Sequence, residues 1–112
     1  MKRIFAVLLL LCFLCGCGPA EIPADSDGLT VHFIDVGQAD CALLLCDGQS
    51  MLIDGGNVED SDLVVAYLRE QGISTLDYVV NTHAHEDHVG GLPGVLAVFE
   101  TKNIRSEERR VG

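Results

Sequence analysis

Residues 82–91 read Thr-His-Ala-His-Glu-Asp-His-Val-Gly-Gly, and this stretch decides how the rest of the chain is interpreted. It follows an apolar run that predicts a buried strand, so the histidines begin where a strand ends. Alternate residues of an extended backbone point to one side, so His83 and His85 can offer their imidazoles to one ion. Asp87 and His88 follow as the chain turns and can face a second ion. Imidazole and carboxylate donors suit zinc, manganese or iron better than calcium.

The alternative to a metal site is a solvated polar cluster, since a single histidine at a strand end is usually only a polar terminus. Three histidines and an aspartate within six residues favour metal binding, because the chain has only four histidines. The fourth, His32, stands alone on a predicted strand and is interpreted as structural. Gly90 and Gly91 let the backbone pass close behind the ligands and turn into a helix.

Upstream of this stretch, the pattern predicts three strands joined by tight turns. Residues 30–36 alternate in the manner of a strand, residues 41–45 are almost continuously apolar, and residues 51–54 form a third short run. Asp47-Gly48 between the last two is a strong two-residue hairpin signal. The first three strands should therefore form a meander.

The period then changes to that of helices. Gly72 is placed to end the first helix, and Pro93 suits the start of the second. A predicted strand, residues 76–80, lies between the two helices. The helical stripes consist of Leu63, Val64, Tyr67 and Leu68, and of Leu92, Val95, Leu96 and Phe99. The order βββ-α-β-loop-α predicts an α/β (α+β layered) fold with helices on one face of a sheet. Residues 41–45 are apolar on both sides, so the other face should be covered as well.

Three motifs together resemble a known family. Residues 82–91 resemble the metal-binding motif of the metallo-β-lactamase superfamily. Residues 31–40 (Val-His-Phe-Ile-Asp-Val-Gly-Gln-Ala-Asp) and 52–56 (Leu-Ile-Asp-Gly-Gly) are similar to the C-terminal hydrolase domain of ComEC-type competence proteins and their stand-alone relatives. Ala39 departs from the glycine common there. The resemblance spans residues 30–104 and implies an αββα sandwich, of which this chain would supply the N-terminal αβ half.

The resemblance also implies roles for individual residues. His83 and His85 would bind a first metal ion, and Asp87 and His88 a second, with zinc expected and manganese or iron as alternatives. Asp87 would also act in catalysis by orienting the attacking water. Asp54 would steady the ligand loop through hydrogen bonds, although an aspartate before two glycines can equally be a turn former. Asp35 and Asp40 are interpreted as carboxylates that structure their loop, and Glu86 as facing solvent.

The activity implied is hydrolysis by metal-activated water, and in ComEC-type relatives the substrate would be a phosphodiester such as single-stranded DNA. Two rivals remain: another hydrolase of the superfamily (thioesterase-, lactonase- or β-lactamase-like), and a non-catalytic surface lipoprotein. Four side chains are too few for two zinc ions that want about four ligands each. We therefore expect this chain to bind metal weakly and to be inactive, and the complete protein to bind metal and to catalyse hydrolysis.

The N-terminus has the pattern of an export signal. Lys2 and Arg3 precede an apolar run, residues 4–14, that is shorter than the about 20 residues of a membrane span. Leu-Cys-Gly-Cys at 14–17 resembles a bacterial lipobox with Cys17 as the acylated residue. Residues 1–16 would then be a lipoprotein signal peptide and 17–29 a flexible tether, giving an exported protein anchored to the cell envelope. A plain signal peptide is the alternative.

The remaining features concern charge, the C-terminus and the cysteines. Between positions 17 and 104 two basic residues stand against fifteen acidic ones, so contact with nucleic acid would depend on metal ions or on further sequence. Residues 105–112 (Arg-Ser-Glu-Glu-Arg-Arg-Val-Gly) match the in-frame translation of a widely used sequencing adapter, and the alternative is a natural charged tail. Cys41 and Cys46 lie too far apart along one strand for a disulfide and are both predicted to be buried.

Overall fold

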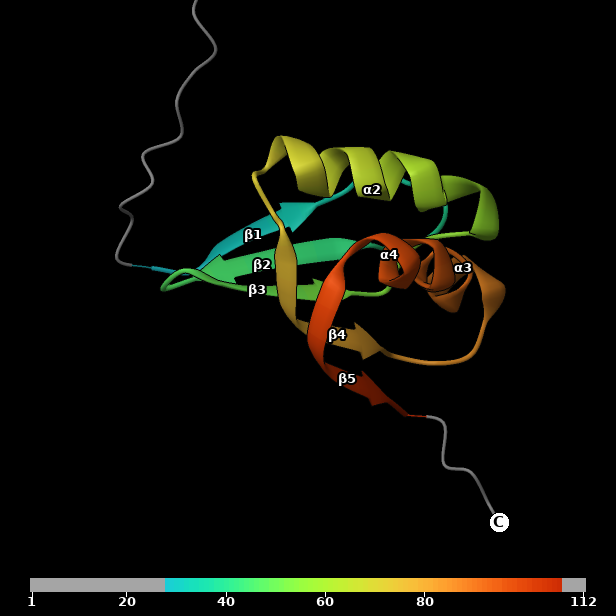
Figure 1. The fold of residues 1–112 in the computed structure, drawn as a ribbon. Helices are drawn as coiled ribbons and strands as arrows, with labels where there is room; N and C mark the ends of the chain where they lie inside the picture. Colours follow the sequence, from blue (N-terminus) through green and yellow to red (C-terminus); the bar gives the residue numbers. More distant parts are fainter. Residues whose placement is uncertain (1–27, 108–112) are drawn as a thin grey trace, which may run out of the picture.

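The computed structural model describes residues 28–107, which contain one five-stranded mixed sheet (Figure 1). The predicted signal peptide, Cys17, most of the tether and residues 108–112 lie outside this range. The strands are β1 (Thr30–Phe33), β2 (Ala42–Cys46), β3 (Gln49–Ile53), β4 (Thr75–Asn81) and β5 (Glu100–Ser106), and they neighbour one another in chain order. Strands β1 to β3 are antiparallel, whereas β3, β4 and β5 run parallel.

The meander was predicted from its turn chemistry. Asp47 and Gly48 both have positive φ angles, 49° and 73°, which a two-residue hairpin turn requires. This turn pairs Cys46 with Gln49 and brings Leu43 opposite Leu52. Both leucines are fully buried. Because a slip of one residue would turn every side chain to the other face, the hairpin fixes which residues of β2 and β3 enter the core.

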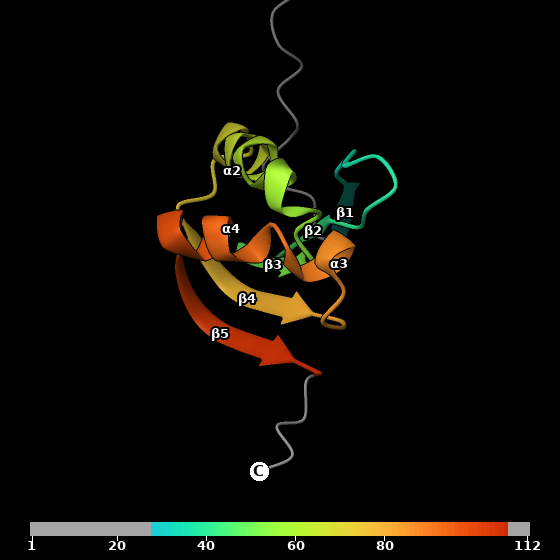
Figure 2. The same ribbon diagram turned by 90° about the vertical axis from the view of Figure 1, so that its right-hand side faces the viewer.

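Two helices connect the parallel strands. Helix α2 (Ser61–Glu70) follows a short 3-10 turn, η1 (Val58–Asp60), and ends before Gly72, whose φ of 76° suits a glycine there. Helix α4 (Leu92–Val98) leads into β5. Right-handed crossovers that advance in one direction place their helices on the same side of a sheet. The figures show α2 and α4 over one face, with the core between them and the strands (Figures 1 and 2).

Two expectations about the elements were wrong, and one strand was not predicted. That strand is β5, which follows Phe99 and pairs with β4 as far as Ser106. The boundary at position 104 and the adapter interpretation of residues 105–112 stay predictions. The loop of residues 81–91 contains a one-turn helix, α3 (Glu86–Val89), and β1 ends at Phe33 rather than at position 36. No helix in the described part of the chain is long and apolar enough to cross a membrane.

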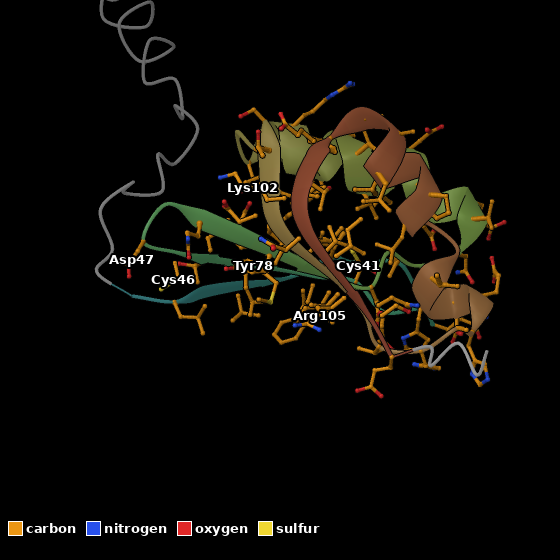
Figure 3. All side chains as sticks on the ribbon, turned by 60° about the horizontal axis from the view of Figure 1, so that its bottom comes forward. Cys41, Cys46, Asp47, Tyr78, Lys102 and Arg105 are labelled. Atoms are coloured by element: carbon orange, nitrogen blue, oxygen red, sulfur yellow. The ribbon has the colours of Figure 1, made fainter. Side chains whose placement is uncertain are left out.

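Polar contacts attach β5 to the sheet. The carboxylate of Asp77 in β4 accepts a hydrogen bond from the backbone NH of Ser50 at 2.9 Å and one from Nζ of Lys102 at 2.7 Å, so one side chain links β3, β4 and β5. The hydrogen bonds from Lys102 and from Ser50 hold the pKa of Asp77 below its usual value, although burial opposes them. Figure 3 shows Lys102 on this part of the sheet.

The face of the sheet away from the helices is apolar and open. The strand register places Val31, Leu44, Met51 and Tyr78 in one row and Phe33, Ala42, Ile53 and Val80 in the next. Phe33 is 85% exposed, and Figure 3 brings this side forward with Tyr78 labelled. Within residues 28–107 no element packs over these rows, so the expected cover for the second face is not part of the described structure.

The two cysteines of this region differ in environment. Cys41 is buried, and burial raises the pKa of its thiol to about 12, with the nearby carboxylates of Asp54 and Asp60 adding to the shift. Cys46 is exposed at the hairpin, so the expectation that both are buried was wrong for Cys46. Cys46 ends strand β2 and alternates with the buried Leu43 in the same sense as Leu44, so its side chain points to the open face of the sheet.

Candidate metal centre

The predicted ligands lie at the C-terminal end of the parallel strands, where sites of layered α/β folds usually form. The arrows of β4 and β5 point toward this end, and α3 stands there (Figure 1). Asp54 directly follows β3, and Thr82 and His83 directly follow β4. His85 is the N-cap residue of α3, and Asp87 and His88 lie within it. The one-turn helix is therefore what gathers the sequence motif into a small volume.

Asp54 is the buried centre of the hydrogen bonding. Its carboxylate accepts hydrogen bonds from the Thr82 backbone NH at 2.8 Å, from the Thr82 hydroxyl at 2.6 Å, and from Nδ1 of His88 at 2.9 Å. Its residue is only 3% exposed, and its φ of 59° is left-handed. Asp54 thus both makes the turn before Gly55 and steadies the ligand loop, so the two interpretations of this residue are compatible.

These contacts fix the tautomers of two histidines. A carboxylate has no proton to give, so Nδ1 of His88 carries the hydrogen. The Thr82 hydroxyl uses its only proton toward Asp54, so Nδ1 of His83, 3.0 Å from that oxygen, must donate as well. Both rings are therefore left with Nε2 as the nitrogen that can bind a metal. A hydrogen bond to the other ring nitrogen is the usual support of a metal-binding histidine. Thr82 was not singled out for this role in the sequence.

The three imidazoles of the motif lie together. The ring centroids of His83 and His88 are 3.9 Å apart, and those of His83 and His85 are 4.8 Å apart. His32 lies elsewhere, with its Nδ1 2.8 Å from the Tyr67 hydroxyl, as its interpretation as structural requires.

Carboxylates surround His88. Oδ2 of Asp87 is 3.6 Å and Oδ2 of Asp40 is 3.4 Å from Nε2 of His88, and Asp54 occupies the opposite nitrogen. The hydrogen bond to Asp54 raises the pKa of His88 despite partial burial, and the charges of Asp54, Asp87 and Asp40 add to the shift. Burial alone would raise the pKa of Asp54, but its hydrogen bonds from Thr82 and His88 outweigh this and lower it.

Two residues that the sequence did not assign to the metal site, Asp40 and Glu86, make contacts in or beside it. Asp40, expected only to structure its loop, reaches the site from the connection between β1 and β2. Glu86 is exposed as expected, yet its Oε1 also accepts a hydrogen bond at 2.9 Å from the backbone NH of Val58, which ties α3 to η1. Among residues 28–107, the carboxylate of Asp35 accepts a hydrogen bond only from the Gly37 backbone NH within its own turn, in agreement with a structural role.

Glycines allow two backbone segments to meet behind the ligands. The Gly55 NH donates to the His88 carbonyl at 2.8 Å, and the Gly91 NH donates to the Gly56 carbonyl at 3.0 Å. A Cβ atom on Gly91 would collide with the Gly55 carbonyl, and one on Gly90 would lie 2.5 Å from the Glu86 carbonyl oxygen. These contacts link the turn that carries Asp54 to the loop that carries the histidines.

The donor chemistry fits divalent zinc-like ions, because Nε2 of His88 faces the carboxylates of Asp40 and Asp87 and the His83 ring lies beside it. Among residues 28–107, however, no three such side chains are already positioned to hold one ion together. The side chains of Asp87 and Asp40 are 42% and 71% exposed, so they have room to move toward a ligand. The metal roles of His83, His85, Asp87 and His88 stay predictions.

Residues 34–111 match the family model of the Metallo-beta-lactamase superfamily, and this range contains strands β2 to β5, the helices and the histidine loop. The chain belongs to this superfamily. A hydroxyacylglutathione hydrolase of Aliivibrio salmonicida (strain LFI1238) is 34% identical over 62 residues, which are 55% of this chain and 23% of that protein. The relatives in this superfamily are hydrolases by name.

Solved structures of metallo-β-lactamases share the fold. The lactamase SMB-1, bound to 2-mercaptoethanesulfonate, superposes with a TM-score of 0.56 and 30% identity over 62% of this chain and 27% of its own. A metallo-β-lactamase of Cronobacter sakazakii gives a TM-score of 0.56 at 23% identity over 65% of this chain and 29% of its own, which supports the fold alone. This superfamily member thus spans about a quarter of the length of the relatives it matches.

Proposed function

We propose that the protein is a metal-dependent hydrolase that acts through two divalent ions, with zinc as the expected metal, at His83, His85, Asp87 and His88. The observation that supports this most is the buried carboxylate of Asp54, which orients His88 so that Nε2 faces the carboxylate of Asp87. A bare polar loop would gain nothing from burying a charged aspartate to fix one imidazole ring, since burial of a charge is costly unless it is fully hydrogen-bonded.

In this mechanism the residues of the site would have different roles. Bound ions would lower the pKa of a coordinated water from about 15.7 to about 7 and so supply hydroxide at neutral pH. Asp54 and Thr82 hold the imidazoles with Nε2 outward, which limits the cost of ordering them. An Oδ of Asp87 would accept a hydrogen bond from the attacking water and direct its lone pair toward the substrate.

We propose a phosphodiester as the substrate class, with single-stranded DNA as a candidate. The support is the similarity of residues 31–40 and 52–56 to ComEC-type hydrolase domains. A thioester is the second candidate, because the curated relative at 34% identity is a hydroxyacylglutathione hydrolase. The surface does not attract phosphate by itself, since fifteen acidic residues stand against two basic ones between positions 17 and 104.

A substrate panel with the complete gene product tests these proposals. We expect hydrolysis of bis(p-nitrophenyl) phosphate that a chelator abolishes and zinc restores. In His85→Ala the rate should fall at least about a hundredfold, because activation of water by the bound metal is lost. The His32→Ala variant is the matched control and should retain activity. Cleavage of a glutathione thioester or of a β-lactam alone would favour the other branches, and turnover unaffected by chelation would refute the metal mechanism.

We also propose that the protein is exported and anchored to the cell envelope through a lipid on Cys17. The support is the sequence at 14–17, where glycine precedes the cysteine and leucine stands three positions before it. Cells expressing the protein and fed labelled palmitate should incorporate label into wild type and into Cys15→Ala, but not into Cys17→Ala. Equal labelling of Cys17→Ala, or none in any form, would show that this anchor does not exist.

A further inference from the structure

The loop between β1 and β2 holds Asp40 against the metal-binding loop by its backbone. The Asp40 NH donates to the Asp87 carbonyl oxygen at 3.2 Å, and the Asp40 carbonyl accepts from the Gly56 NH at 3.0 Å. One residue is thereby fixed between the segment that carries the expected ligands and the turn that carries Asp54. Neither bond involves the side chain, so the carboxylate is free to serve another purpose.

That carboxylate points at the nitrogen where a metal is expected. Oδ2 of Asp40 is 3.4 Å from Nε2 of His88, slightly nearer than Oδ2 of Asp87 at 3.6 Å. Nδ1 of His88 already donates to Asp54, so in the neutral ring Nε2 presents a lone pair to two anionic oxygens. Such an arrangement is repulsive unless a positive charge lies between the groups. A divalent cation bound between Nε2 of His88 and the two carboxylates would supply that charge.

We propose that Asp40 is an additional ligand of the ion expected at His88 and Asp87. This inference rests on the proposed function, and it assigns a side chain from outside the His-His-Asp-His motif to the same ion. An imidazole nitrogen with two carboxylates is a donor set that suits zinc or manganese. It also reduces the shortage of ligands, because five side chains of this region rather than four would serve two ions.

The neighbouring aspartate in the loop supplies a matched control. Asp35 is exposed like Asp40, and its carboxylate accepts a hydrogen bond from the Gly37 NH at 3.1 Å within its own turn. Asp40→Asn keeps the size of the side chain and leaves both backbone hydrogen bonds possible, while it removes the negative charge. Asp35→Asn makes the same chemical change in the same loop without touching the site.

Zinc chloride is titrated into the full chain while the Nε2 resonance of His88 is followed by ¹⁵N NMR in histidine-labelled protein. We expect zinc to shift this resonance in wild type and in Asp35→Asn at the same concentration, and Asp40→Asn to need at least about tenfold more zinc. Retention of the Nδ1–H signal of His88, which reports its bond to Asp54, shows that the Asp40→Asn variant is folded. That readout separates a ligand role from a merely structural one.

The outcomes are distinguishable. If zinc moves the His88 resonance equally in wild type and Asp40→Asn, Asp40 is not a ligand, and the proposed function stands without it. If zinc does not move the resonance in wild type at millimolar concentration, both this inference and the metal role of His88 fail. If Asp40→Asn loses the Nδ1–H signal, Asp40→Glu, which restores the charge, must recover wild-type zinc affinity for the proposal to survive.

Discussion

Asp54→Asn is expected to weaken zinc binding at His88 by about 10- to 100-fold, because it removes the charge that orients the metal-binding ring. It should also destabilise the chain by about 2 kcal/mol, since a buried amide cannot satisfy all three donors that the carboxylate satisfies. Asparagine tolerates the left-handed backbone found at this position, so the variant isolates the loss of charge from backbone strain. Zinc titration and urea denaturation measure the two effects.

The control for this variant is Asp35→Asn, which should leave both zinc affinity and stability within the error of wild type. Asp54→Ala should be less stable than Asp54→Asn by a further increment, because alanine disfavours a φ of 59°. If Asp54→Asn bound zinc as tightly as wild type, the buried carboxylate would be a turn former only, and the argument that it serves the site would fail.

The Gly91→Ala variant is expected to lose about 3 kcal/mol or more of stability, the upper end of the cost of overpacking. The backbone of Gly91 is helical, so alanine is conformationally allowed, and the cost arises from space alone. The added Cβ would meet the Gly55 carbonyl group, with its carbon at 2.9 Å, and a backbone group cannot rotate away as a side chain can. Relief requires the turn with Asp54 and the histidine loop to separate.

Gly28→Ala is the matched control for crowding, because no atom of the structurally described residues lies within 4 Å of a Cβ built at Gly28. Thermal and urea unfolding followed by circular dichroism should show Gly28→Ala unchanged and Gly91→Ala strongly destabilised or unfolded. A Gly91→Ala protein within about 0.5 kcal/mol of wild type would mean that the two segments are not held in close contact.

Local chemistry made part of the fold predictable. The hairpin at Asp47-Gly48 and the end of α2 before Gly72 depend on backbone conformations that a few residue types favour, and the structure has positive φ at all three. Strand β4 and helix α4 carry the apolar patterns of buried elements, which are also local properties. These features confirm that turn residues and periodicity define the order of elements up to residue 98.

The elements that were missed owe their existence to tertiary contacts. Strand β5 reads Glu-Thr-Lys-Asn-Ile-Arg-Ser, without apolar alternation, and it is attached through its pairing with β4 and through Asp77. Helix α3 has only four residues, too few to show a helical period. Hydrophobic periodicity in a sequence reflects burial, and neither β5 nor α3 is buried enough to show such a period.

In the candidate site, too, local features could be predicted from the sequence and features that depend on tertiary contacts could not. Spacing alone grouped His83, His85, Asp87 and His88, because they are close in the chain. Asp40 lies 47 positions from Asp87, and their proximity depends on one backbone hydrogen bond between loops. The acidic character of residues 35–40 gave no sign of which aspartate faces the histidines, since both are exposed and flank the same turn.

Zinc titration by calorimetry, on the wild-type chain and on a His83→Ala/His85→Ala double variant, tests the central claim most directly. We predict measurable but weak zinc binding in wild type, a lower stoichiometry in the double variant because the ion expected at His83 and His85 is lost, and wild-type behaviour in His32→Ala, whose imidazole lies against Tyr67. Zinc binding of equal affinity and stoichiometry in the double variant would contradict the account, because the ions would then be bound somewhere other than the loop that follows β4.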